Sequence, residues 1–152
     1  GEEIQQEMKA LEIGKSRTIQ EGKKVAILSF GAMLSPAIDT AKALDATLVD
    51  MRFIKPFDTN RVLDLAKSHE LIVTLEENVI AGGAGSGISE FLRQAEINTP
   101  IIHLGLPDRF IPHGKPEALL QQCGLDSDGI TASIQQYLQN SAAKNPVIGN
   151  TA

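Results

Sequence analysis

The sequence has few of the features that mark secreted or membrane proteins. It contains a single cysteine, Cys123, which cannot form a disulfide within the chain, and no signal peptide opens it. We therefore expect a reducing, cytoplasmic location. No apolar run approaches the ~18 residues needed to cross a bilayer, so no contact with a membrane is expected.

Positive charge is also scarce. The chain carries 14 lysine and arginine residues against 19 aspartate and glutamate residues, which gives a formal net charge of -5. Without a lysine or arginine block, this balance argues against electrostatic capture of nucleic acid or anionic lipid. The 152 residues, 42% of them hydrophobic, are typical of one soluble globular domain whose partners are small molecules or proteins.

Motifs for metal binding and nucleophilic catalysis are missing. The histidines His69, His103 and His113 show no H-x-x-x-H or H-x-H spacing. No serine lies in a G-x-S-x-G motif, and Cys123 lies on the apolar stripe of an expected helix, as a buried thiol would. We therefore expect no catalytic, cofactor-binding or metal-binding residue in this chain.

Short apolar runs alternate with helical patterns along the chain. The runs at residues 25–30, 46–54, 71–77 and 100–106 are β-branched and nearly continuous, as in parallel strands covered on both faces. Between and after them we expect helices that start at the N-cap Ser35, at the N-cap Asp58, just before the 88–95 stripe, at Pro116 and near residue 126. The predicted fold class is α/β, a three-layer fold with a mainly parallel sheet and helices on both faces. Residues 15–20 suggest an additional antiparallel edge strand.

The two ends of the chain differ from its middle. Residues 1–14 are polar and irregular and lack an initiator methionine, which suggests a linker from a preceding domain of a larger polypeptide. Residues 15–140 form the expected α/β domain. Residues 141–152 are small and polar, and we expect them to be a disordered tail.

Charged residues follow the expected strands. Ligands of open α/β sheets bind beyond the carboxyl ends of the strands, where this sequence places Arg52, Lys55, Asp108, Arg109 and the segment Glu76, Glu77 and Asn78. Two interpretations remain open, an active-site edge and a set of solvated or interface charges.

The glycine-rich stretch "GGAGSG", residues 82–87, looks like a phosphate loop but lacks its chemistry. Ile88 stands where the third glycine of G-x-G-x-x-G and the lysine of a P-loop would stand. Glu76 and Glu77 end the preceding strand and would repel an anion. We interpret the loop as a packing element, in which a carboxylate such as Glu77 or another segment satisfies the first amides of the following helix.

Three segments carry a family resemblance. "LVDMRFIKPFD", "VTLEENVIAGGAGSGISEFL" and "LGLPDRFIPHG", in this order and spacing, resemble the C-terminal domain of the 1-deoxy-D-xylulose-5-phosphate synthases, members of the transketolase superfamily. The resemblance implies a transferase that uses thiamine diphosphate and Mg²⁺ to join pyruvate to glyceraldehyde 3-phosphate. It also implies that both cofactors bind outside this fragment, which would be inactive alone, because the G-D-G motif is absent here.

The resemblance further implies a role in assembly. The expected partners are the remaining domains of the same polypeptide and a second subunit of a homodimer. The candidate interface residues are Glu76, Glu77, Asn78, Gly82, Gly83, Gly85, Ser86 and Gly87. If Gly83 has a negative φ, we expect Gly83→Val to leave the domain folded and to weaken assembly.

Two alternatives remain. The chain could be the equivalent domain of a 2-oxo acid dehydrogenase β-subunit, which shares the "KP(L/F)D" turn and the strand ending in "EE" and would have lipoyl-protein partners. It could also be a free-standing module that binds a small phosphorylated ligand at the amides of Gly83, Gly85 and Ser86.

Overall fold

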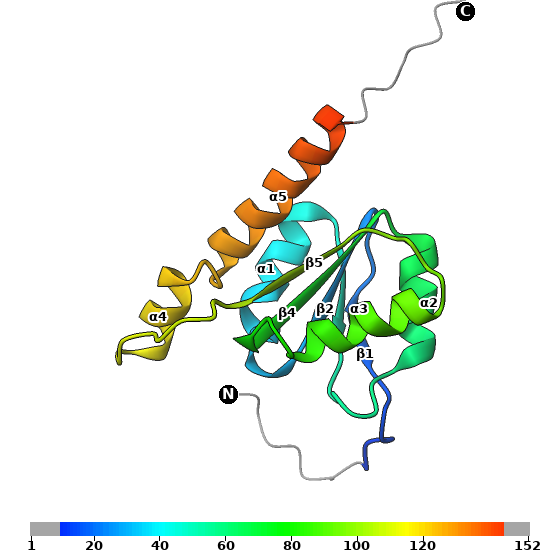
Figure 1. Ribbon diagram of the computed structural model, residues 1–152, viewed down its shortest axis with the longest axis horizontal. Coiled ribbons are helices and arrows are strands. Elements are labelled where there is room, and N and C mark those ends of the chain that lie inside the picture. Colours follow the sequence, from blue (N-terminus) through cyan, green and yellow to red (C-terminus); the bar gives the residue numbers. More distant parts are fainter. Residues whose placement is uncertain (1–9, 145–152) are drawn as a thin grey trace, which may run out of the picture.

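The computed structural model describes residues 10–144, which form one five-stranded sheet with helices around it (Figure 1). The strand order is β1-β3-β2-β4-β5, with β1 antiparallel to β3 and every other pair parallel. The predicted fold class and the antiparallel edge strand are therefore confirmed. The strands are β1 (Arg17–Gln20), β2 (Val25–Ser29), β3 (Thr47–Asp50), β4 (Leu71–Val79) and β5 (Ile101–Leu106).

The strands follow the apolar runs, with one clear difference at β3. This strand ends at Asp50, although the apolar run continues to residue 54. The Asp50 carboxylate accepts the N–H of Arg52 at 3.2 Å, and Arg52 has a φ of 56°, which an extended strand does not allow. A local aspartate turn thus ends the strand before its hydrophobic sequence ends.

The helices also occur where periodicity predicts them. They are α1 (Leu34–Leu44), α2 (Thr59–Ser68), α3 (Ala84–Gln94), α4 (Pro116–Gln122) and α5 (Ser127–Lys144), with a 3-10 turn η1 (Gly31–Met33) before α1. Ser35 is not an N-cap, because η1 runs directly into α1 and places Ser35 inside the first helical turn. Helix α5 includes the first residues of the expected tail. Residues 1–9 and 145–152, on which the linker and tail predictions also fall, lie outside the described part.

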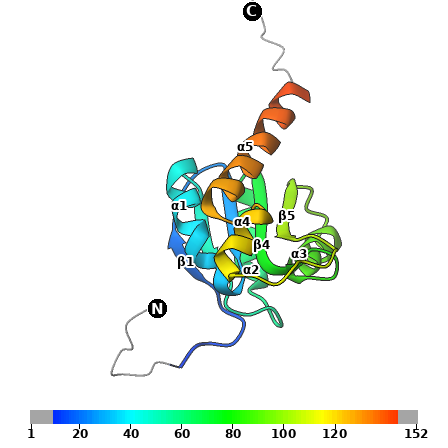
Figure 2. The same cartoon turned by 90° about the vertical axis from the view of Figure 1, so that its left-hand side faces the viewer.

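Two apolar layers cover the sheet. One contains α1 and α5, with Ala37 and Ala41 from α1 and Ile130 and Ile134 from α5 buried against the sheet. The other contains α2 and α3, whose buried residues include Val62, Leu65, Ile88 and Leu92. Figures 1 and 2 show these two helix pairs on opposite sides of the sheet. The central strand β2 is buried along its whole length, as its apolar sequence requires.

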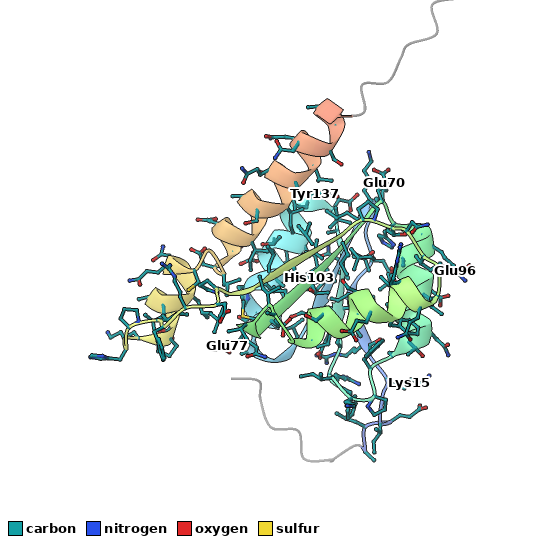
Figure 3. The ribbon with its side chains drawn as sticks, viewed as in Figure 1. Lys15, Glu70, Glu77, Glu96, His103 and Tyr137 are labelled. Atoms are coloured by element: carbon teal, nitrogen blue, oxygen red, sulfur yellow. The ribbon has the colours of Figure 1, made fainter. Side chains whose placement is uncertain are left out.

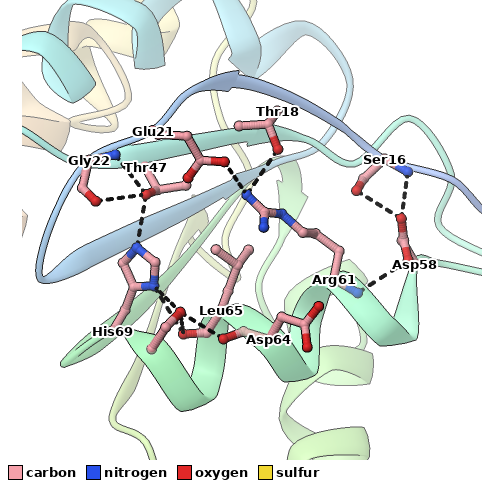
Figure 4. A network of polar contacts seen from close by, with 11 residues as sticks. Ser16, Thr18, Glu21, Gly22, Thr47, Asp58, Arg61, Asp64, Leu65 and His69 are labelled. Atoms are coloured by element: carbon pink, nitrogen blue, oxygen red, sulfur yellow. Dashed lines mark hydrogen bonds and ion pairs between the residues drawn. The ribbon is translucent and has the colours of Figure 1, made fainter.

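A network of hydrogen bonds connects β1 and its flanking residues to the start of α2 (Figure 4). Asp58 is the N-cap of α2, as predicted, and accepts the N–H of Arg61 at 3.2 Å. The other oxygen of Asp58 accepts the N–H and the hydroxyl of Ser16, both at 3.0 Å. The Arg61 guanidinium donates to Thr18 at 3.0 Å and to Glu21 at 2.9 Å. These contacts hold the edge strand in place where the apolar core does not reach it.

Candidate interface at the carboxyl edge of the sheet

The strand order produces a crevice at the carboxyl edge of the sheet. Strand β3 follows β2 in the chain and lies on one side of it. Strand β4 lies on the other side of β2 and is followed by β5, which lies farther out on that side. Diverging connections of this kind leave room for a ligand or partner. A cavity of about 700 Å³ lies here, lined by residues from the ends of β2 and β4, the 54–59 loop and the start of α3. Its apolar lining includes Phe30, Ile54, Pro56, Phe57 and Ala84.

A buried carboxylate forms the base of this cavity. Glu76 is 3% exposed, and its two oxygens accept the N–H groups of Ala84 at 2.8 Å and of Gly85 at 2.9 Å. It therefore caps α3, whose own N-cap residue, Gly83, has no side chain to do so. The capping carboxylate is Glu76 and not Glu77. Successive side chains of a strand point to opposite sides, and Glu77 is exposed at the end of β4 (Figure 3).

Two of the loop glycines are required by the domain itself. A Cβ at Gly83 would lie on the Glu76 carboxylate and 2.6 Å from the carbonyl oxygen of Val79. A Cβ at Gly85 would meet the hydroxyl of Thr74 and lie 2.6 Å from Nδ1 of His103. Gly83 has a φ of -76°, yet it cannot accept a side chain. The expectation that a negative φ would make Gly83→Val harmless to the fold is wrong, because the close approach of Glu76 decides the outcome.

The other glycines of the loop have open space around them. Gly82 adopts a φ of 77°, which the turn requires, and no atom lies within 4 Å of its potential Cβ. Gly87, in the first turns of α3, has neither a positive φ nor a neighbour within 4 Å. Both line the cavity. Ser86 closes the turn, because its hydroxyl donates to the carbonyl oxygen of Ile80 at 2.8 Å and accepts the N–H of Gly82 at 3.1 Å. Nothing within the described chain requires glycine at position 87.

A histidine links the elements behind the cap. His103 of β5 contacts the Thr74 hydroxyl through Nδ1 at 2.6 Å and the Ser89 hydroxyl through Nε2 at 2.8 Å. Burial lowers the pKa of His103 below its ordinary value of 6.5, and the charge of Glu76 partly offsets this. The neutral imidazole thus joins β4, β5 and α3, and Figure 3 labels it on β5 beside α3.

The remaining charges of the carboxyl edge do not gather in one site. Lys55, Glu77 and Asn78 line the cavity. Arg52 instead lies 3.7 Å from Asp50, an aspartate that also pairs with Arg17 of β1. Asp108 and Arg109 are exposed beyond β5 and do not line this cavity. Within residues 10–144, no cluster of three His, Cys, Asp or Glu residues could hold a metal ion, and no helix could span a membrane.

Residues 14–130 match the family described as "Transketolase, C-terminal domain". The chain belongs to this family. It is 55% identical to 1-deoxy-D-xylulose-5-phosphate synthase of Chromobacterium violaceum and 53% identical to the synthase of Vibrio parahaemolyticus. Each match spans 91% of this chain but only 22% of the relative. The chain therefore spans about a fifth of the length of these curated relatives.

Solved structures give the same assignment of fold. A structure described as "Split gene transketolase, inactive beta4 tetramer" superposes with a TM-score of 0.77 at 33% identity, over 85% of this chain and 44% of the other. Transketolase from Leishmania mexicana superposes with a TM-score of 0.59 over 84% of this chain and 18% of the other. At 16% identity, that second likeness concerns the fold alone.

Proposed function

We propose that this chain is the C-terminal domain of a thiamine-diphosphate-dependent transferase. The reaction would condense pyruvate with glyceraldehyde 3-phosphate and release CO₂. Its product, 1-deoxy-D-xylulose 5-phosphate, is a precursor of isoprenoids, thiamine and pyridoxal phosphate. The observation that carries the proposal is the 55% identity to a synthase of that name across 91% of this chain.

The carboxyl edge does not fit thiamine diphosphate and Mg²⁺. The first amides of α3, the natural place for a diphosphate, already donate to Glu76. Glu77 adds a second negative charge to the cavity lining. We therefore place both cofactors in other parts of a longer polypeptide. The same observation weighs against a free-standing module that binds a small phosphorylated ligand at these amides.

The carboxyl-edge cavity is better suited to protein contacts. It combines an apolar wall with a polar rim of Lys55, Glu77 and Asn78, and glycine leaves its mouth open at positions 82 and 87. A neighbouring backbone can approach glycine more closely than any other residue. We propose that this surface receives the remaining domains of the same polypeptide within a homodimeric, cytoplasmic enzyme. The tetramer named for the split-gene transketolase supports self-assembly among relatives of this fold.

The experiment for the reaction compares the 152-residue chain with the longest reading frame that contains it. The long protein should form 1-deoxy-D-xylulose 5-phosphate when supplied with thiamine diphosphate and Mg²⁺. The chain alone should form none and should give no heat of binding in a calorimetric titration with the two cofactors. Micromolar binding to the chain alone would contradict this division, and an inactive long protein would contradict the proposed reaction.

The experiment for assembly uses Gly87→Leu in the long protein. Because no atom lies within 4 Å of a Cβ at this position, the domain should stay folded and gain about 0.5–1 kcal/mol from losing a helical glycine. The side chain would nevertheless fill the cavity mouth and reduce activity or assembly. Glu90→Leu, an exposed change on the same helix outside the cavity, is the control. Equal activity of the two variants would refute the assembly role.

A further inference from the structure

Exposed apolar side chains gather where the described part of the chain begins. Within residues 10–144, five large apolar side chains are exposed, namely Leu11, Ile13, Ile19, Ile54 and Phe110. Leu11 is 55% exposed, Ile13 72% and Ile54 62%. These three belong to the first segment of the chain and to the loop between β3 and α2, which run side by side in Figures 1 and 2. Single exposed apolar residues are common, but a group of them marks an interaction surface. We call Leu11, Ile13 and Ile54 the entry patch.

The backbone beneath the entry patch is fixed within the domain. The Lys15 N–H donates to the carbonyl oxygen of Glu12 at 3.2 Å, which closes a turn in which Gly14 has a φ of 75°. This turn packs on the neighbouring loop, because a Cβ at Gly14 would lie 3.2 Å from Cγ of Pro56. The exposed side chains therefore stand on ordered backbone, and a partner that covers them does not have to order a loop first.

The entry patch continues the apolar wall of the carboxyl-edge cavity. Ile54 lines that cavity together with Pro56 and Phe57. Because Pro56 also packs against the turn at Gly14, the cavity wall and the first segment of the chain meet at this loop. The surface assigned above to the remaining domains is thus wider than the cavity itself. It reaches the point at which the preceding sequence joins the domain.

We propose that the domain directly preceding this one in the longer polypeptide packs on the entry patch, with Ile13 and Ile54 as anchors. This inference rests on the proposed function, in which the chain is a C-terminal domain, and it names which of the remaining domains covers this surface. The covering surface is apolar, because the three side chains of the patch are aliphatic and offer no hydrogen bond.

The position of the patch favours the preceding domain over a second copy of this chain or a separate protein. The matched family is described as a C-terminal domain, and the chain spans only 22% of the Chromobacterium violaceum synthase. In a polypeptide of that kind, most of the remaining sequence is attached at the amino end, beside the entry patch. A neighbour on a short linker has an effective concentration on the order of 1 mM, which a separate protein rarely reaches. The tethered domain therefore occupies the patch before any other partner of equal affinity.

Cysteine labelling measures whether the entry patch is covered. Ile54→Cys should react with a maleimide about tenfold or more slowly in the long protein than in the 152-residue chain, because only the long protein contains the covering domain. Phe110→Cys is the matched control, since Phe110 is also exposed but lies beyond β5, and it should react at the same rate in both proteins. Adding Ile13→Asp to Ile54→Cys in the long protein should restore fast labelling, because a carboxylate is costly to bury in an apolar contact.

Three labelling results would overturn the proposal. Equal rates for Ile54→Cys in the two proteins would show that nothing covers the patch. Equal slowing of Ile54→Cys and Phe110→Cys would show that the protection is not specific to it. Protection that survives Ile13→Asp would show that this side chain is no anchor.

A photo-cross-linker identifies the occupant. Benzophenone maleimide attached at Ile54→Cys in the long protein should join a peptide of the preceding domain, and the product should keep the mass of one chain. A product with the mass of two chains would assign the patch to a second copy and overturn the proposal. Labelling and cross-linking do not depend on turnover. An inactive long protein would therefore contradict the proposed reaction, while these two readouts still decide the docking.

Discussion

Helices α2 and α3 lie on the same face of the sheet but begin in different ways. Helix α2 is capped by its own N-cap residue, Asp58, whose carboxylate accepts the N–H three residues later. Helix α3 has glycine at its N-cap and is capped by Glu76, which belongs to the preceding strand and is almost fully buried. The first cap is local and partly solvated, whereas the second ties the helix to the core of the sheet.

The two caps should also differ in how much they stabilise the folded domain. Water can replace a cap that lies at the surface, so losing it costs little. Water reaches the amides of a buried cap less easily, and unsatisfied buried donors are expensive. Changes at the start of α3 should therefore destabilise the domain more than changes at the start of α2.

We expect the largest effect from Gly83→Val. Its side chain would displace the Glu76 carboxylate and press on the Val79 carbonyl, which is backbone and cannot rotate away. The loss should be about 3 kcal/mol or more in the free energy of unfolding, measured by urea denaturation of the 152-residue chain. Gly87→Val, where no neighbouring group lies within 4 Å of the added Cβ, is the control and should change the free energy of unfolding by less than about 1 kcal/mol. Similar losses for both variants would show that the space around Gly83 does not matter.

Glu76→Ala should have the next largest effect. It leaves the N–H groups of Ala84 and Gly85 without their acceptor, at a cost of about 2 kcal/mol. Glu77→Ala removes an exposed carboxylate one residue away and should change the free energy of unfolding by less than about 0.5 kcal/mol. If the two substitutions cost the same, Glu76 is not the cap of α3.

Asp58→Ala should cost about 1 kcal/mol, the usual value for a lost N-cap. The change removes the acceptor of the Arg61 N–H and also the contacts with Ser16. Asp58→Asn retains one acceptor oxygen and should recover part of the loss. A cost for Asp58→Ala above that of Glu76→Ala, measured in the same denaturation series, would reverse the ranking of the two helix starts.

Helices α2 and α3 should also respond to acid in different pH windows, because a titratable group with a shifted pKa bonds to each of them. At α3, burial lowers the pKa of His103, so the unfolded chain takes up a proton that the folded chain resists, and stability falls as the pH drops below 6.5. At α2, burial of Asp58 is outweighed by the N–H groups of Ser16 and Arg61, so its pKa lies below 3.8. The stability that Asp58 contributes is therefore fully present above pH 3.8. It is lost as the pH falls through the lower pKa of Asp58 in the folded chain.

Melting temperatures can separate these two windows. His103→Gln should reduce the loss of melting temperature between about pH 7.5 and about pH 5. Asp58→Ala should leave the loss over that range unchanged. An unchanged pH dependence in His103→Gln would show that this histidine takes no part in the acid response.

The same contrast explains what the sequence could predict. Apolar runs, helical stripes and the Asp58 N-cap are patterns of residues that are close in the sequence. They therefore predict the strands, the helices and the parallel sheet correctly. Ser35 was misassigned because a 3-10 turn precedes α1, which no side-chain pattern signals. The Glu76 cap depends on which side chains of β4 face α3, and the need for glycine at position 83 depends on where that carboxylate lies. Both are set by the fold and not by local sequence.

The position of β2 gives the domain an internal reference for hydrogen exchange. This strand is paired on both sides, with β3 and β4, and all of its residues are buried. Its amides can exchange with solvent only when the whole sheet opens, whereas the first amides of α3 can exchange when that helix start alone detaches. Deuterium uptake at residues 26–29 therefore reports global unfolding, and uptake at Ala84 and Gly85 in the same sample reports the local opening that Glu76 resists.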